Sequence, residues 1–135
     1  MGKNTNSIGY PGLKLGRLNA TVAKSIGKTC ADIYISYNHI KHIENKHHAE
    51  LDLLGLGAVE YVRLIVQSYT QIRTGSGSSI LLVLFKEGNN RHPVAAIDLN
   101  YSLKNNIWEV KTAGARETSA VIKKKLLWES CRPSK

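Results

Sequence analysis

The stretch ILLVLFKEGNNRHPVAAIDLNYSLKNNIWEVKTAG, residues 80–114, decides the fold. It contains three runs of strand-forming residues, which begin at Ile80, Pro93 and Ile107. The connections GNN and KNN are short and rich in asparagine, which is typical of antiparallel neighbours. The sequence therefore predicts a three-strand meander, whose last strand ends at Gly114.

Two helices are expected before the meander. Apolar residues take up a helical period from Tyr37, and Gly55 and Gly57 end this first helix. A second helix is expected from Ala58 to about Ile72, followed by the loop TGSGSS. The expected inward faces are Ile40, Ile43, His47, Leu51 and Leu54 in the first helix, and Val59, Val62, Val66 and Tyr69 in the second. Helices first and strands second predict an α+β fold, with the N-terminal helices packed on one face of a mostly antiparallel sheet.

The N-terminal segment carries a weaker pattern. Residues 1–32 are expected to form an irregular basic lead-in with a short helix from Ala20 to Ile26, and residues 33–135 a single domain. The abrupt start suggests a piece cut from a longer polypeptide. Residues 33–36 are a short strand or the beginning of the first helix.

The C-terminal segment, residues 117–132, fits two structures. Ile122 and Leu126 suit a helix capped by Thr118 or Ser119, whereas Val121, Ile122 and Trp128 suit a closing strand. Cys30 and Cys131 have the spacing of neither a zinc site nor a redox pair, so free thiols are expected, with one long-range disulfide as the alternative.

The charge of the chain is distributed unevenly. The net charge is +9 on 135 residues, and it divides into +5 for residues 1–30, −1 for residues 31–110 and +5 for residues 111–135. Clustered positive charge of this kind favours binding to a polyanion over simple solvation of two charged ends. The longest apolar run, Ile80–Phe85, is far shorter than the ~20 residues that span a bilayer, so no membrane segment is expected.

Histidines are the first candidates for chemistry. His47 lies on the apolar face of the first expected helix, and imidazole suits proton transfer near neutral pH. A buried structural histidine is the alternative, and His48 beside it is a second choice. His39 and His42 have helical spacing for a shared zinc ion, but no nearby residues complete a ligand set. Because carboxylates are scattered singly, a two-magnesium site is not expected either.

Phosphodiester cleavage without a metal requires an internal nucleophile, which RNA supplies as its 2′-hydroxyl. Strand alternation predicts Thr112 on one face with Val110 and Trp108, and Glu109 and Lys111 on the other. The Thr112 hydroxyl and the guanidinium of Arg116 are expected to stabilise the phosphate. The alternative is that both are ordinary solvent-facing side chains without a catalytic role. Additional RNA contacts are expected from His42, Lys46, Lys111, Lys123, Lys124 and Lys125.

The helix sequence HIKHIENKHHAEL, the second helix and the meander ending in WEVKTAG resemble the barnase, EndoU, colicin and RelE-like group of ribonuclease domains over about residues 33–128. The likeness is strongest to members found at the C-termini of contact-dependent growth inhibition proteins. It implies a catalytic histidine at His47, a strand-end hydroxyl at Thr112 and a phosphate contact at Arg116 or Lys46. The directly adjacent His48 departs from a clean family pattern.

The resemblance also implies a biological setting. Such domains commonly cleave tRNA without a cofactor, are released from a larger secreted or cell-surface bacterial protein, and act in the target-cell cytoplasm. A cognate immunity protein blocks them in the producing cell, and the charge of +9 predicts that this partner is acidic. Some toxins of this kind also exploit a translation elongation factor of the target cell. A non-catalytic RNA- or DNA-binding module is the alternative function.

Overall fold

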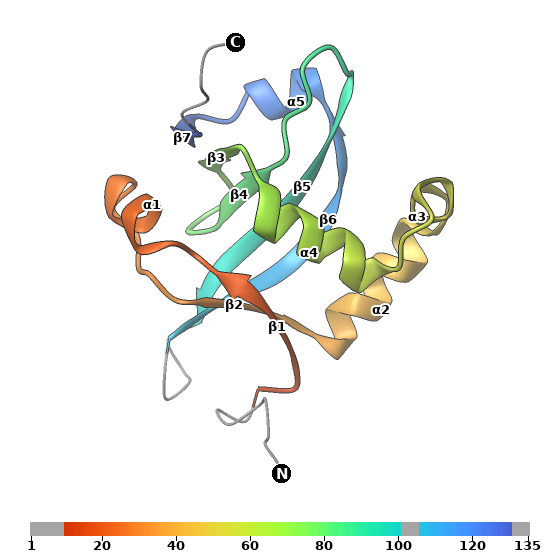
Figure 1. Ribbon diagram of the computed structural model, residues 1–135, viewed down its shortest axis with the longest axis horizontal. Coiled ribbons are helices and arrows are strands. Elements are labelled where there is room, and N and C mark those ends of the chain that lie inside the picture. Colours follow the sequence, from red (N-terminus) through yellow and green to blue (C-terminus); the bar gives the residue numbers. More distant parts are fainter. Residues whose placement is uncertain (1–9, 101–105, 131–135) are drawn as a thin grey trace.

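The computed structural model describes residues 10–100 and 106–130 (Figure 1). Within these ranges the chain forms helices α1 (Ala20–Ser25), α2 (Tyr37–Lys46), α3 (His48–Leu54), α4 (Ala58–Ser68) and α5 (Thr118–Ile122). The strands are β1 (Gly12–Arg17), β2 (Asp32–Ser36), β3 (Gln71–Thr74), β4 (Ile80–Val83), β5 (Arg91–Asn100), β6 (Ile107–Glu117) and β7 (Leu126–Glu129).

The described strands form one sheet in the order β1-β2-β6-β5-β4-β3-β7. Strands β4, β5 and β6 are antiparallel neighbours, which confirms the predicted meander. Strand β2 runs parallel to β6, and every other neighbouring pair among the described strands is antiparallel. The α+β fold with a mostly antiparallel sheet is therefore confirmed.

Two of the three clusters of buried hydrophobic residues join helices to the sheet. In the larger cluster Ile43 of α2 and Val62 of α4 pack with Trp108 of β6, and all three are fully buried. The smaller cluster joins Val121 of α5 to β4 and β5, including Ala96. Burying a large apolar side chain stabilises the fold by roughly 1.5–3 kcal/mol. The N-terminal helices thus cover one face of the sheet, and α5 packs with the smaller cluster.

The N-terminal segment belongs to the same sheet, so the predicted irregular conformation is wrong for residues 12–17. Strand β1 pairs antiparallel with β2, and Leu15 and Leu18 are buried in the larger cluster. The predicted short helix is confirmed as α1, which Asn19 caps by accepting from the Thr21 backbone N–H at 2.8 Å. The first nine residues of the predicted lead-in lie outside the described residues.

The first predicted helix is two helices, which meet at His47. The His47 backbone, at φ −117° and ψ 26°, lies outside the helical region. Both helices are nevertheless hydrogen-bonded to it, because the His47 N–H donates to the Ile43 carbonyl and the His47 carbonyl accepts from the Leu51 N–H. Leu54, predicted to face inward, is 54% exposed. The single-helix prediction is therefore wrong at the position that carries the candidate histidine.

The second predicted helix is too long. Helix α4 ends at Ser68, and Gln71 begins strand β3. The chain becomes extended because the Thr70 N–H donates to the Val83 carbonyl of β4 at 2.9 Å, which replaces a helical hydrogen bond by a sheet one. Residues 33–36 belong to β2, so the strand alternative is confirmed there.

The C-terminal segment combines both structures that its sequence allows. Helix α5 is followed by β7, which pairs with β3 through Ile72 and Trp128. Cys30 is half-buried and free, while Cys131 lies outside the described residues. No helix in the described ranges is long and apolar enough to cross a bilayer.

Candidate functional site

A β-bulge in β6 sets the direction of the site residues. Ala96 pairs with Thr112 and Ile97 pairs with Val110, so Lys111 is an extra residue between two paired positions. The bulge turns Thr112 away from the core face that Val110 occupies, and the predicted alternation of these two residues is therefore wrong. Thr112 instead lies beside Lys111 and Arg116 in the lining of an open hollow.

The His47 ring packs directly against Gly114 of β6. A Cβ atom built on Gly114 would lie 2.6 Å from Nε2 of the imidazole, which is closer than real Cβ atoms approach, and 3.0 Å from Nδ1. Only glycine therefore leaves room for the ring at this position. Strand β2 pairs with β6 only as far as Glu109, so α2, which follows β2 directly, reaches the later part of β6.

Glu50 of α3 holds the other side of the His47 ring. Its Oε1 lies 3.2 Å from Nδ1 of His47, and both side chains are about one-fifth exposed. A carboxylate at this distance favours the tautomer with the proton on Nδ1, which leaves Nε2 as the acceptor that faces β6. Arg91 of β5 lies beside this pair, with one guanidinium nitrogen 3.9 Å from Glu50 Oε2 and donating to the Ala115 carbonyl at 3.2 Å.

The predicted residues meet in a small pocket of about 130 Å3, here called the His47 pocket. Lys46, His47, Thr112 and Arg116 all line it, together with Gly114 and its neighbours. Within residues 10–100 and 106–130, the side chains of Lys46, Thr112 and Arg116 have no hydrogen-bond or ion-pair partner. Two unneutralised cations, a hydroxyl and an imidazole therefore converge on one space, as binding of an anion requires.

A second hollow of about 300 Å3 continues from the first and shares Thr112 and Arg116 with it. Lys111 and Lys124 line this hollow, and the Nζ of Lys111 lies 3.0 Å from Glu109 Oε1. The other predicted RNA contacts lie elsewhere on the surface: His42, Lys123 and Lys125 are exposed and line neither hollow.

The neighbouring histidines have different surroundings. His48, the second choice for the catalytic role, is 76% exposed and lies 3.4 Å from Asp52. His39 is half-buried, and its Nδ1 lies 2.7 Å from the Ser36 hydroxyl. Burial lowers the pKa of His39, and the nearby positive charge of Lys111 lowers that pKa further. Among the described residues, no group of three or more His, Cys, Asp or Glu side chains has the arrangement to hold a metal ion.

Sequence reasoning missed Glu50, Arg91 and Gly114. Glu50 follows His47 by three residues, a spacing that brings side chains together on a helix, and this was the available signal. The sequence predicts Gly114 only as the end of a strand, and this end is wrong because β6 continues to Glu117. The role of Arg91 depends on the pairing of β5 with β6, which no local pattern reveals.

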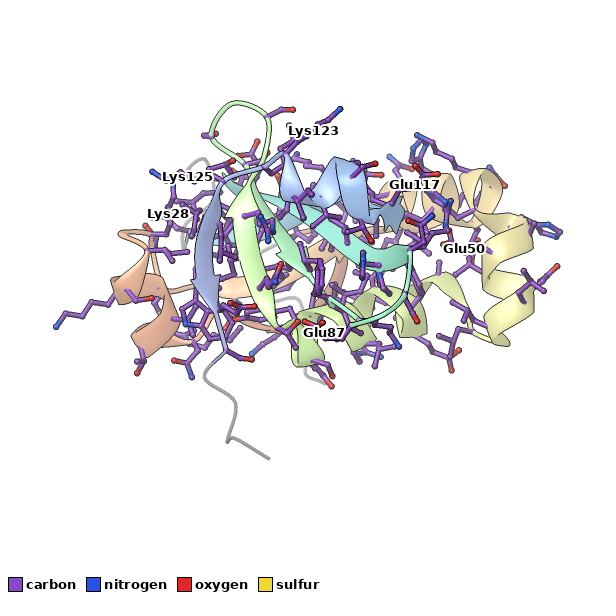
Figure 2. All side chains as sticks on the ribbon, turned by 90° about the horizontal axis from the view of Figure 1, so that it is seen from above. Lys28, Glu50, Glu87, Glu117, Lys123 and Lys125 are labelled. Carbon is purple, nitrogen blue, oxygen red and sulfur yellow. The ribbon has the colours of Figure 1, made fainter. Side chains whose placement is uncertain are left out.

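Lysines from both basic segments of the sequence lie at one end of the molecule. Figure 2 shows Lys28 and Lys125 toward one end, Lys123 near the middle, and Glu50 and Glu117 toward the other end. The +5 segments at the two ends of the sequence thus both contribute lysines to one end of the structure.

In comparisons with known proteins, no family model, no curated protein and no solved structure matches this chain.

Proposed function

We propose that this chain is a metal-independent endoribonuclease that cleaves tRNA. The observation that carries the proposal is the His47 pocket, in which an imidazole oriented by a carboxylate faces a hydroxyl and two unpaired cations. These groups are the ones required when the 2′-hydroxyl oxygen of RNA attacks the adjacent phosphorus. Lys124 of the neighbouring hollow would hold a further phosphate of a folded RNA.

We assign a role to each group of the His47 pocket. Nε2 of His47 accepts the proton of the 2′-hydroxyl, whose oxygen forms a bond to phosphorus. Arg116, Lys46 and the Thr112 hydroxyl stabilise the negative charge that develops on the phosphate oxygens. The bond from phosphorus to the 5′-oxygen breaks, and that oxygen takes a proton from water. The products are a 2′,3′-cyclic phosphate and a 5′-hydroxyl end.

Incubation of the protein with total bacterial RNA in EDTA tests this proposal. Wild type should cleave tRNA, and His47→Ala should reduce the rate by about 10²–10⁴-fold, the usual contribution of a general acid or base. His48→Ala is the matched control and should keep wild-type activity because His48 is exposed. Absence of cleavage by wild type would refute the enzyme and leave the non-catalytic RNA- or DNA-binding module.

Glu50 is proposed as the residue that positions His47. Glu50→Gln should lower kcat by about 10–100-fold with little change in KM, because it removes a charge-assisted contact worth roughly 1.5–3 kcal/mol. Asp52→Asn is the matched control, since Asp52 is 71% exposed and faces His48. Equal kinetics for the two variants would contradict the assignment.

The proposed biological role is that of a toxin domain delivered into the cytoplasm of a neighbouring bacterium. Expression should halt growth, and a cognate immunity protein of negative net charge should restore it, because opposite charge favours association with a +9 domain. A translation elongation factor is a further candidate partner. Unimpaired growth of cells that express wild type, but no immunity protein, would contradict the toxin role.

A further inference from the structure

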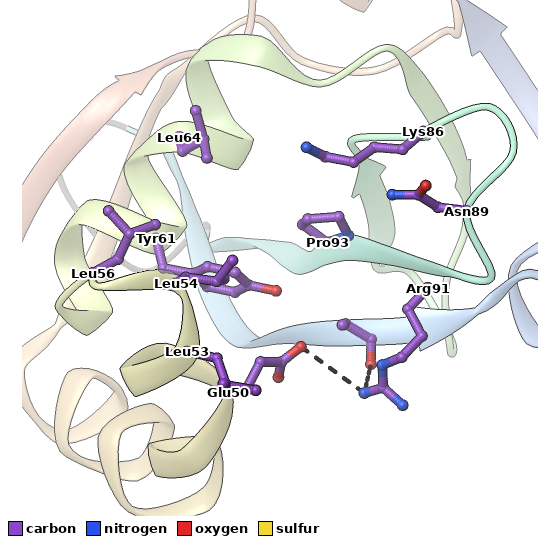
Figure 3. Close-up of a pocket in the computed structure, with 11 residues that line it drawn as sticks. Glu50, Leu53, Leu54, Leu56, Tyr61, Leu64, Lys86, Asn89, Arg91 and Pro93 are labelled. Atoms are coloured by element: carbon purple, nitrogen blue, oxygen red, sulfur yellow. Dashed lines mark hydrogen bonds and ion pairs between the residues drawn. The ribbon is translucent and has the colours of Figure 1, made fainter.

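A larger cavity of about 350 Å3 lies between α3, α4 and the turn that joins β4 to β5 (Figure 3). Its walls are mainly apolar and include Leu54 of α3, Leu64 of α4 and Pro93 of β5. Lys86 and Asn89 line the opposite side, where Figure 3 shows both polar ends directed toward the cavity. The cavity thus combines apolar walls with a polar edge.

Tyr61 lines this cavity and carries a buried hydroxyl group. Tyr61 is 1% exposed, and its hydroxyl has no hydrogen-bond partner in the part of the chain that the structure describes. A buried polar group without a partner costs roughly 1–3 kcal/mol. Burial, followed by the charge of Glu50, raises the pKa of Tyr61, so the hydroxyl keeps its proton and remains a donor.

The cavity adjoins the His47 pocket. Ala115 lines both spaces, and Glu50 lines the cavity while it contacts His47. Arg91 lies at the boundary, where it contacts Glu50 and the Ala115 carbonyl (Figure 3). A ligand with an anionic group in the His47 pocket could therefore extend its uncharged part into the cavity.

We propose that this cavity binds a nucleobase of the RNA whose phosphate occupies the His47 pocket, an inference that rests on the proposed function. A base is flat and apolar on its faces, which suits the leucine and proline walls, and polar at its edge, which suits Asn89 and Lys86. The Tyr61 hydroxyl donates to an acceptor on that edge. An aliphatic side chain of a protein partner would leave all three polar groups without a hydrogen bond.

Fluorescence of 2-aminopurine measures base binding without cleavage. Short oligouridylates, each with one 2-aminopurine ribonucleotide at a different position, are titrated with the His47→Ala protein. One position should show a saturable change in fluorescence. Leu64→Trp, combined with His47→Ala, should fill the cavity and weaken that binding by at least about tenfold. Leu126→Trp is the matched control, because Leu126 and Leu64 are 41% and 42% exposed and Leu126 lies on β7.

Tyr61→Phe tests the hydroxyl in the otherwise wild-type enzyme. It should reduce the preference between bases next to the cleaved bond by about tenfold, the effect of one hydrogen bond. Tyr10→Phe is the control, because Tyr10 is also a buried tyrosine and does not line the cavity. Urea unfolding of both variants separates lost stability from lost base preference.

The outcomes separate this inference from the proposed function. A fluorescence change at one position, lost in Leu64→Trp, supports the base site even if wild type cleaves no RNA, in which case only the proposed function fails. Cleavage by wild type with unchanged base preference in Tyr61→Phe and Leu64→Trp overturns the base site alone. If Leu54→Glu converts an oligomer to a monomer and no probe responds, the cavity is a contact between copies of the chain, which also overturns it.

Discussion

Gly114 shows how a residue without a side chain can define a site. The imidazole of His47 occupies the space that a Cβ atom on Gly114 would take, and the pocket beside it is bordered by Thr112 and Arg116 on the same strand. The position of His47 is thus set from two sides, by the Gly114 backbone and by the Glu50 carboxylate.

Gly114→Ala should displace the imidazole and lower kcat/KM for RNA cleavage by about 10²-fold, the cost of a misplacement of about 1 Å. Gly16→Ala is a suitable control, because Gly16 also lies within a strand and its new methyl group would meet only the Val66 side chain at 3.0 Å. Similar activity losses in the two variants, after correction for unfolded protein, would contradict a specific role of Gly114.

His92 makes the stability of the fold dependent on pH. It is fully buried and stacked on Phe85, its Nδ1 accepts the Lys86 backbone N–H at 2.9 Å, and its Nε2 lies 2.7 Å from the Thr118 hydroxyl. Burial lowers the pKa of His92, which nearby Glu87 only partly opposes. The unfolded chain therefore binds a proton more readily than the folded protein.

The His92 contribution to stability is present above the unfolded pKa of about 6.5 and is lost as the pH falls below it, by no more than about 1.4 kcal/mol per pH unit. Urea unfolding at about pH 7.5 and about pH 5.5 measures this loss. The loss should be smaller in His92→Gln than in wild type. Equal losses would assign the acid sensitivity to other groups, such as His39.

At the scale of single elements, the bulge in β6 allows one strand to serve the core and the site. Val110 and Ala113 both lie in the larger cluster, although they are three positions apart in the strand, because Lys111 is an extra residue. Without Lys111 the strand would alternate regularly and keep the pairs of Ile97 with Val110 and of Ala96 with Thr112. The pairing of β5 with β6 therefore does not require Lys111.

Deletion of Lys111 should accordingly leave the sheet folded, with a free energy of unfolding within about 1–2 kcal/mol of wild type. It should still lower kcat/KM by about 10²-fold, because the local twist that directs Thr112 and Arg116 changes. Lys111→Ala controls for the lost charge and should retain more activity. A deletion variant with the kinetics of Lys111→Ala would show that the bulge itself is dispensable.

The sequence predicts the elements that have strong local patterns. The meander follows from its apolar runs and asparagine turns, and α4 follows from its stripe. Strand β1 was missed because its pairing partner lies beyond α1, although Leu13 and Leu15 alternate with polar or small residues. The sequence predicts His47, Thr112 and Arg116 as the residues of one catalytic site. It does not predict the helix break at His47 or the bulge at Lys111, because both depend on long-range contacts.

At the scale of the whole molecule, Lys28 and Lys125 lie at the end of the protein opposite Glu50 and Glu117 (Figure 2). Lys124 connects that end to the site, because it lines the hollow that shares Thr112 and Arg116 with the His47 pocket. An RNA bound in the site can therefore contact Lys124 through a further phosphate.

Binding of the His47→Ala protein to tRNA should weaken as salt rises, and Lys124→Ala should reduce the slope of log K against log salt by roughly 0.7–0.9. Lys41→Ala is the control, because Lys41 is exposed on α2 and lines neither hollow. Titrations over a range of KCl concentrations measure both slopes. An unchanged slope for Lys124→Ala would place the RNA elsewhere on the surface.

The parallel pairing of β2 with β6 also determines when the site forms during synthesis. Strand β2 ends at Ser36, but its neighbour begins only at Ile107, so the middle of the sheet stays open until the ribosome has made most of the described chain. His47 and Glu50 are synthesised before Gly114, against which the His47 ring packs in the folded protein. A nascent or truncated chain that ends before β6 therefore has the histidine but not the pocket.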